Sequence, residues 1–236
     1  MWFVRSLAHR HREPEIQDQP DLDSELLWQA LAGLESINFW SRSLYVLWPS
    51  IRTLSRQMKR PLRILDIATG AADVPISLWH LARRAKLAVQ IEACDLNPRT
   101  VSYAQHRARE KRADVHVFQL DVLHQEVPHP YDVILCSLFL HHLSDAEAVR
   151  VLDRMAQAAA HMLLVNDLLR CVEGLVLAHL SVPLLTRSKV NRVDSVRSVR
   201  AAFTVDEARS LATRAGLRGA VVEKRWPCRY LLKWTR

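Results

Sequence analysis

The chain has 236 residues, a length that fits one domain or one domain with an appended segment. Hydrophobic residues make up 49% of it and charged residues 25%, which excludes wholesale disorder and collagen-like repeats. No apolar run reaches the roughly 18 residues of a membrane span, and the first residues lack the apolar core of a secretory signal. The four cysteines form no CxxC pair, which is typical of free, mostly buried thiols. We therefore expect a folded, cytoplasmic protein.

The formal net charge is +8, and the excess lies at one end of the chain. Residues 187–236 hold 13 Lys and Arg against 4 Asp and Glu. Such a region can face an anionic substrate, a lipid headgroup surface or nucleic acid, although charge-rich segments are usually solvated faces. We favour the solvated face and expect no specific nucleic-acid partner. Peripheral membrane contact stays an alternative, and the sequence does not predict an oligomeric state.

The first 60 residues predict a helical segment. From Asp21 to about Gln57, leucine and alanine recur at helical spacing, and Pro61 then ends any helix. We expect residues 1–60 to form a lid over a hydrophobic acceptor pocket, with ordinary core packing as the alternative for its aromatic residues. These aromatic residues are Trp28, Phe39, Trp40, Tyr45 and Trp48.

After Pro61, short apolar runs alternate with longer helical ones, which predicts a parallel sheet covered by helices on both faces. A helical insertion is expected at about 171–203, and the apolar runs on either side of Pro227 predict a C-terminal β-hairpin. Residues 61–236 would thus form one α/β domain with a mostly parallel, seven-stranded sheet. The expected strands are RILDIA, AVQIEAC, VHVFQL, YDVILCSLFL, MLLVN, AVVEKRW and RYLLKW.

Small and acidic residues gather where the first three strands end. The first strand runs into LDIATGAAD, whose small residues at 68, 70 and 72 let a ligand approach the backbone closely. Asp95 ends the second strand, where a carboxylate can accept hydrogen bonds from both ribose hydroxyls, and Asp121 ends the third. One such aspartate is more often a helix cap or turn residue. Their joint placement at one sheet edge predicts a nucleoside site.

Two nucleoside cofactors fit this pattern, a nicotinamide dinucleotide and S-adenosylmethionine. The dinucleotide fingerprint GxGxxG requires glycines where this chain has Ala68 and Asp73. Asp73 would also place a negative charge near a pyrophosphate. The turn therefore favours S-adenosylmethionine.

Over roughly residues 60–166 the chain resembles the class I S-adenosylmethionine-dependent methyltransferases. The motifs LDIATGAADVP, ACDLNP, FQLDVL and YDVILCSLFLHHL carry the resemblance. LHHL, the helical N-terminal segment and the RWPCRYLL terminus resemble the branch that contains quinone and polyketide-phenol methyltransferases. The resemblance implies a Rossmann-like fold, S-adenosylmethionine as donor and S-adenosylhomocysteine as product.

The resemblance also implies which residues contact the cofactor. The turn, together with Asp66 and Ser137, would lie against the methionine part of the cofactor. Asp95 would hold the ribose, and Leu96 would pack on the adenine. Asp121 would accept a hydrogen bond from the adenine amino group, with Val122 beside it. Alanines at 68 and 72 depart from the usual glycine-rich turn. The implied set is Asp66, Ala68, Thr69, Gly70, Ala71, Ala72, Asp95, Leu96, Asp121, Val122 and Ser137.

His141 and His142 follow the fourth strand directly and are the candidate catalytic residues. If the acceptor is a phenol or enol, a histidine can take its proton, although capping and packing before the next helix is an equal alternative. Asn166 and Asp167 end the fifth strand and could contact the acceptor or cap a helix. A sulfonium donor is already activated, so we expect no metal.

The end of the fourth strand also indicates the acceptor. It reads SLFL, without the Asp/Asn-Pro-Pro-Tyr/Phe segment that many methyltransferases of base amino groups carry. We expect O- or C-methylation of a small, apolar phenol, quinol or polyketide-like molecule. The alternatives are an RNA methyltransferase that uses the basic C-terminal region, and a non-catalytic cofactor-binding partner protein.

Overall fold

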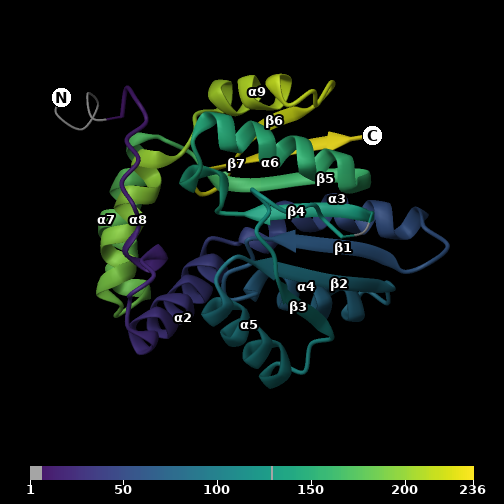
Figure 1. Ribbon diagram of the computed structural model, residues 1–236, viewed down its shortest axis with the longest axis horizontal. Helices are drawn as coiled ribbons and strands as arrows, with labels where there is room; N and C mark the ends of the chain where they lie inside the picture. The colour runs from purple at the N-terminus through teal and green to yellow at the C-terminus, as the bar shows by residue number, and fades with distance from the viewer. Residues whose placement is uncertain (1–6, 129) are drawn as a thin grey trace.

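The computed structural model describes residues 7–128 and 130–236. Within them one seven-stranded sheet has the order β3-β2-β1-β4-β5-β7-β6 (Figure 1). Only β7 runs antiparallel to its neighbours, β5 and β6, so the predicted mostly parallel sheet and C-terminal hairpin are confirmed. The strands are β1 (Leu62–Ile67), β2 (Val89–Asp95), β3 (Val115–Gln119), β4 (Tyr131–Ser137), β5 (Ala159–Leu168), β6 (Val221–Arg225) and β7 (Arg229–Thr235).

Helices cover both faces of the sheet, and several begin at the expected caps. Ser144 with Glu147, and Thr204 with Glu207, form complete capping boxes, and the Asn97 side chain accepts from the backbone N–H of Arg99. The helices are α2 (Ser24–Trp40), α3 (Ser43–Gln57), α4 (Asp73–Arg84), α5 (Pro98–Glu110), α6 (Asp145–Ala158), α7 (Val172–Leu185), α8 (Lys189–Ala201) and α9 (Val205–Arg214), with short 3-10 turns η1 (Ile16–Asp18) and η2 (Leu140–His142).

The strands alternate between two apolar layers. On β1, Leu62 and Ile64 pack with α3 and α4, whereas Leu65 and Ile67 pack with α6 and α9. Because both faces are covered, ligands can reach the sheet only at its ends. In Figure 1 the carboxyl ends of the parallel strands point toward α2, α7 and α8.

The helical pattern from Asp21 to Gln57 divides into two helices with different surroundings. The break falls at Arg42, which has a left-handed backbone with φ of 53°. α3 packs on the sheet through Leu47 and Ile51, but α2 lies against α8. A Cβ on Gly33 of α2 would stand 2.1 Å from Asn191 Nδ2, so this close helix approach requires glycine. The role of residues 1–60 as a lid stays a prediction.

The segment before α2, residues 7–22, is called the strap here. It runs along α7 and α8 (Figure 1) and is tied at both ends. Arg10 donates to the carbonyl oxygens of Ala201 and Leu143 at 2.7 and 2.8 Å, and Arg99 donates to the Leu22 carbonyl at 2.5 Å. The strap is therefore a fixed wall of the structure.

The sequence also led to expectations about the cysteines and about membrane-spanning segments. The four cysteines are free; Cys94 and Cys136 are buried, whereas Cys171 and Cys228 are half-buried. Among the described residues, no helix combines the length and apolarity that crossing a bilayer requires.

Candidate functional site

A cavity of about 730 Å³ lies where the parallel strands end. Twelve of the thirteen predicted site residues line it, from Asp66 on β1 to His142 on η2. The exception is Ala72, which is wholly buried at the start of α4 and packs in the apolar cluster between α4, α5 and the sheet. The cavity brings the predicted residues together, but their individual roles stay predictions.

The turn after β1 contributes mainly small residues to the cavity wall. Ala68, Gly70 and Ala72 have φ values of 53°, 55° and 58°, in the left-handed region that favours glycine. The two alanines adopt it at a cost of about 1–2 kcal/mol each. The strained turn is thereby kept free of bulky groups.

Asp95 joins the ends of β1 and β2. Its carboxylate accepts hydrogen bonds from the backbone N–H of Gly70 at 3.0 Å and of Asn97 at 3.1 Å. Burial raises the pKa of Asp95, while these two bonds act against that rise. Asp121 at the end of β3 accepts from Leu123 N and His124 Nδ1. Burial would raise the pKa of Asp121, but the bond with His124 lowers it.

Some buried polar atoms of the cavity wall have no hydrogen-bond partner among the described residues. They are Asp66 Oδ1, Ser137 Oγ and Arg229 Nη1. Burial raises the pKa of Asp66 to about 8, which indicates that its carboxylate lacks a cationic neighbour. The ammonium and carboxylate of an amino acid would satisfy Asp66 and Arg229, so these residues fit the methionine part of S-adenosylmethionine.

The rest of the cavity wall is mainly apolar and comes from α2, α7, α8 and the turn between β6 and β7, with polar side chains contributed by α8. Of the five aromatic residues expected in a lid pocket, Trp40 lines the cavity, whereas Trp28 packs edge-on against Tyr103 of α5. Trp226 adds an aromatic group that the sequence analysis did not single out. The principal apolar lining residues are Leu34, Ile37, Leu168, Leu177, Ala178, Val182 and Leu185.

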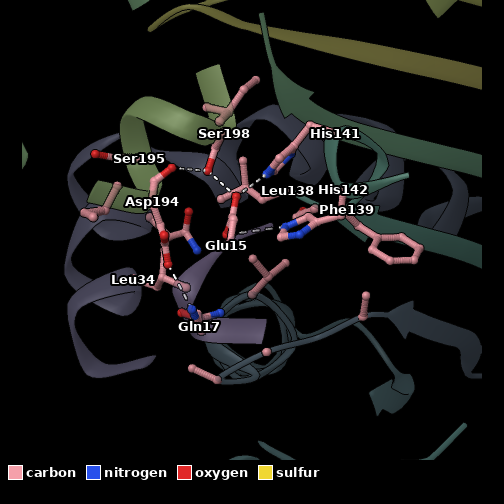
Figure 2. Close-up of a pocket in the computed structure, with 18 of the residues that line it drawn as sticks. Glu15, Gln17, Leu34, Leu138, Phe139, His141, His142, Asp194, Ser195 and Ser198 are labelled. Atoms are coloured by element: carbon pink, nitrogen blue, oxygen red, sulfur yellow. Dashed lines mark hydrogen bonds and ion pairs between the residues drawn. The ribbon is translucent and has the colours of Figure 1, made fainter. Parts of the chain in front are cut away.

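His141 and His142 stand between three carboxylates, two from the strap and one from β5. His141 Nδ1 lies 2.7 Å from Asp167 Oδ1, and His142 Nδ1 lies 2.9 Å from Asp18 Oδ2. Both Nε2 atoms face Glu15 of the strap, at 3.4 Å for His141 and 3.8 Å for His142 (Figure 2). Asp167, expected to contact the acceptor or cap a helix, instead holds His141.

The charges around His141 act against its role as a proton acceptor in this conformation. Burial would lower the pKa of His141, but Asp167 and Glu15 raise it to about 10. At neutral pH the ring is then protonated and its two nitrogens are both occupied. The base stays a prediction.

Sequence reasoning missed Glu15, Asp18 and Arg229. Glu15 and Asp18 precede every recognisable motif, and no local spacing connects them with the histidines. Arg229 had a weak signal, because an arginine at the start of an apolar strand must be paired or line a cavity. Its guanidinium donates to Ser41 Oγ at 2.7 Å.

Comparison with known families decides the class of the domain. Residues 64–161 match the family described as "Methyltransferase domain". The matched segment, less than half of the chain, is similar to a methyltransferase domain. The match agrees with the resemblance found in the sequence for this part of the chain. In a direct comparison, no curated protein sequence matches the chain.

Solved methyltransferase structures share the fold. The S-adenosylmethionine-dependent methyltransferase SibL superposes with a TM-score of 0.65 at 17% identity, over 99% of this chain and 68% of SibL. Magnesium protoporphyrin IX methyltransferase from Synechocystis, with S-adenosylmethionine bound, superposes with a TM-score of 0.56 at 14% identity, over 99% of this chain and 89% of that protein. PigF with S-adenosylhomocysteine superposes with a TM-score of 0.56 at 17% identity, over 74% of this chain and 50% of PigF. The chain thus spans half the length of PigF, and the likeness concerns the fold.

Proposed function

We propose that this protein transfers a methyl group from S-adenosylmethionine to an oxygen or carbon atom of a small apolar phenol, quinol or polyketide-like acceptor. The observation that carries the proposal is the division of one cavity into two parts. Polar strand ends form one part, and apolar side chains of α2 and α7 form the other. The strand ends suit a charged nucleoside, and the apolar part suits a molecule with little polar surface.

On the donor side, we assign roles to residues that already face the cavity. Asp95 takes the ribose hydroxyls, Asp121 and Val122 take the adenine, and Leu96 packs on its ring. Asp66 takes the methionine ammonium, and Arg229 takes the carboxylate. These roles are supported by the unpartnered atoms of Asp66 and Arg229 and by the small residues of the turn that line the cavity.

The reaction needs alignment more than chemical activation. The acceptor atom attacks the methyl carbon in line as the carbon–sulfur bond breaks, and the electron pair of that bond stays on sulfur, which leaves S-adenosylhomocysteine. The protein therefore supplies proximity and a water-poor chamber. The apolar wall from Leu34 to Leu185 is suited to that task.

The basic C-terminal region gives less support to an RNA acceptor. Arg197, Arg209 and Arg225 each lie within ion-pair distance of an acidic side chain, which is the arrangement of a solvated face. An RNA methyltransferase should bind structured RNA more tightly than the roughly 10⁻⁴–10⁻⁶ M of non-specific association, with steep salt dependence. We expect no such binding near 150 mM salt.

The test is turnover measured by mass spectrometry. The purified protein is incubated with methyl-labelled S-adenosylmethionine and a panel of phenols, quinols and aromatic polyketides, together with small molecules that copurify. With ordinary S-adenosylmethionine we expect a product 14 mass units heavier than the acceptor for each methyl group transferred. With the labelled donor, the mass of the label should be added to this difference. Donor binding without turnover of any acceptor would favour the non-catalytic alternative, and labelled RNA would favour the RNA alternative.

A further inference from the structure

Three side chains converge on one point at the acceptor end of the cavity. One possible ligand atom from each of Glu15, His141 and His142 lies within 4.8 Å of the other two, and the histidine nitrogens nearest Glu15 are the Nε2 atoms. Figure 2 shows the two rings, from η2, facing Glu15 of the strap. Such a set of two imidazoles and one carboxylate has the composition of a catalytic metal site.

The spacing of these atoms suits a small divalent ion. Bonds of about 2.0–2.1 Å to His and Glu in a tetrahedral site put neighbouring ligand atoms about 3.3 Å apart. The observed separations are 3.4 Å from His141 Nε2 to Glu15 Oε1 and 3.8 Å from His142 Nε2 to Glu15 Oε2. The ligand atoms lie within 4.8 Å of one another, so each separation has to shorten by at most about 1.5 Å to reach that spacing.

The opposite nitrogen of each ring supplies a second, independent observation. A metal-binding histidine almost always gives its other ring N–H to a carboxylate or carbonyl, which fixes the ring and makes it a better ligand. Here both rings do so, with Asp167 at 2.7 Å and Asp18 at 2.9 Å. Both Nε2 atoms are thereby left to point at the same carboxylate.

Glu15 is held in place although it belongs to the strap. The Asp194 carboxylate accepts from the backbone N–H of Ile16 at 2.9 Å and of Gln17 at 3.0 Å, and Ser198 donates to Glu15 itself. The side chain of Glu15 is 12% exposed and that of His141 is 4% exposed. A ligand set on rigid supports loses little entropy when an ion binds.

We propose that Glu15, His141 and His142 bind a divalent transition-metal ion of the zinc type. Imidazole nitrogens favour such ions over Mg²⁺ and Ca²⁺, which prefer oxygen ligands. All three residues line the cavity, so the ion keeps an open position toward it. This agrees with a catalytic site, in which three protein ligands leave a place for water or substrate.

The role of the ion rests on the proposed methyl transfer and narrows the acceptor to one with a hydroxyl group. The acceptor oxygen would take the open position and its proton would pass to solvent. A lone pair of that oxygen then forms the bond to the methyl carbon as the carbon–sulfur bond of the donor breaks, and the electron pair of that bond stays on sulfur. Our expectation that transfer needs no metal is revised for this acceptor. A histidine that binds metal through Nε2 cannot also take the proton, so this proposal replaces the histidine base.

Metal binding is tested on the full chain without donor or acceptor. Protein freed of metal by a chelator is titrated with Zn²⁺ by calorimetry and with Co²⁺ by its visible absorption spectrum. We expect one equivalent to bind, with a Co²⁺ spectrum typical of low coordination number. Glu15→Gln and His142→Gln should each weaken binding by more than the about 10–100-fold expected when only a supporting group is lost.

Matched variants make the result specific. Glu13→Gln changes a carboxylate of the same strap that points to Arg197 and His11, and it should keep the full affinity. Asp95→Ala should also keep metal binding, whereas it should weaken donor binding, so the failure of either proposal is recognisable separately. Equal Zn²⁺ affinity in the wild type, Glu15→Gln and His142→Gln, each confirmed as folded by thermal unfolding, would overturn the metal site.

Discussion

The two halves of the cavity that we propose for the donor and the acceptor are built in different ways. In the donor half, Asp66, the turn after β1 and Asp95 lie on adjoining strands, and the bond from Gly70 to Asp95 spans 25 positions. In the acceptor half, His142 meets Asp18 across 124 positions and Ser198 meets Glu15 across 183. The donor half is thus a property of successive βα units, whereas the acceptor half exists only when the strap has packed against η2 and α8. The predictions below test whether the two halves are as separable as this construction implies.

The largest effect is expected in the acceptor half. His141→Gln should lower kcat about 10²–10⁴-fold with an identified acceptor, because the proposed ion that activates the acceptor oxygen loses a ligand. The Kd for S-adenosylmethionine should not change, because the donor is held by the strand ends. Steady-state kinetics and calorimetry measure the two quantities. The control is His116→Gln on the exposed edge strand β3, and a parallel loss of donor affinity in His141→Gln would show that the halves are coupled.

The fold and the residues of the proposed donor half could be predicted from the sequence because the patterns that indicate them are local. Strand ends, the small residues of the turn and the caps at Ser144 and Thr204 are all readable within a few positions. The acceptor half has no such signal, because Glu15 and Asp18 acquire their partners only through tertiary packing. The break between α2 and α3 was equally hidden, since Ser41-Arg42-Ser43 contains neither Gly nor Pro.

An ion pair at the amino end of the sheet does not line the cavity, so its loss should change the stability of the fold and not ligand binding. Asp132 accepts hydrogen bonds from both Nη atoms of Arg60 at 2.7 Å and from Arg63 N at 2.9 Å. Asp132→Asn should lower the free energy of unfolding at pH 7 by about 1–3 kcal/mol, a range that allows for the half-exposed Arg60. Donor affinity should be unchanged in this variant.

The pH dependence of that loss has a definite sign. Burial would raise the pKa of Asp132, but Arg60 and the Arg63 N–H hold it below its usual value. The stabilisation is therefore complete above the unfolded pKa of about 4 and disappears as pH falls through the lower folded pKa. Urea unfolding at pH 7 and pH 3 should show the difference between wild type and Asp132→Asn shrinking with acid. Asp153→Asn on α6 is the control, and a difference that grows with acid would contradict the assignment.

The smallest effect concerns the strained turn of the donor half. Ala68→Gly removes the cost of a left-handed alanine, and this gain exceeds the loss from the added entropy of the unfolded chain. The free energy of unfolding should therefore rise by about 0.5–1 kcal/mol. In the ordinary helical backbone of α2, Ala32→Gly should instead cost about 1 kcal/mol. Thermal or urea unfolding compares the two. Destabilisation of equal size in both variants would mean that the turn carries no strain.

The most direct test of the central claim is calorimetric titration of the protein with S-adenosylmethionine and S-adenosylhomocysteine. Both should bind, and Asp95→Ala should weaken binding at least tenfold, because hydrogen bonds to a charged acceptor contribute about 1.5–3 kcal/mol each. Asp114→Ala, an exposed aspartate ahead of β3, should leave the Kd unchanged. Absence of heat with either nucleoside at millimolar concentration, while a nicotinamide dinucleotide binds, would contradict the account.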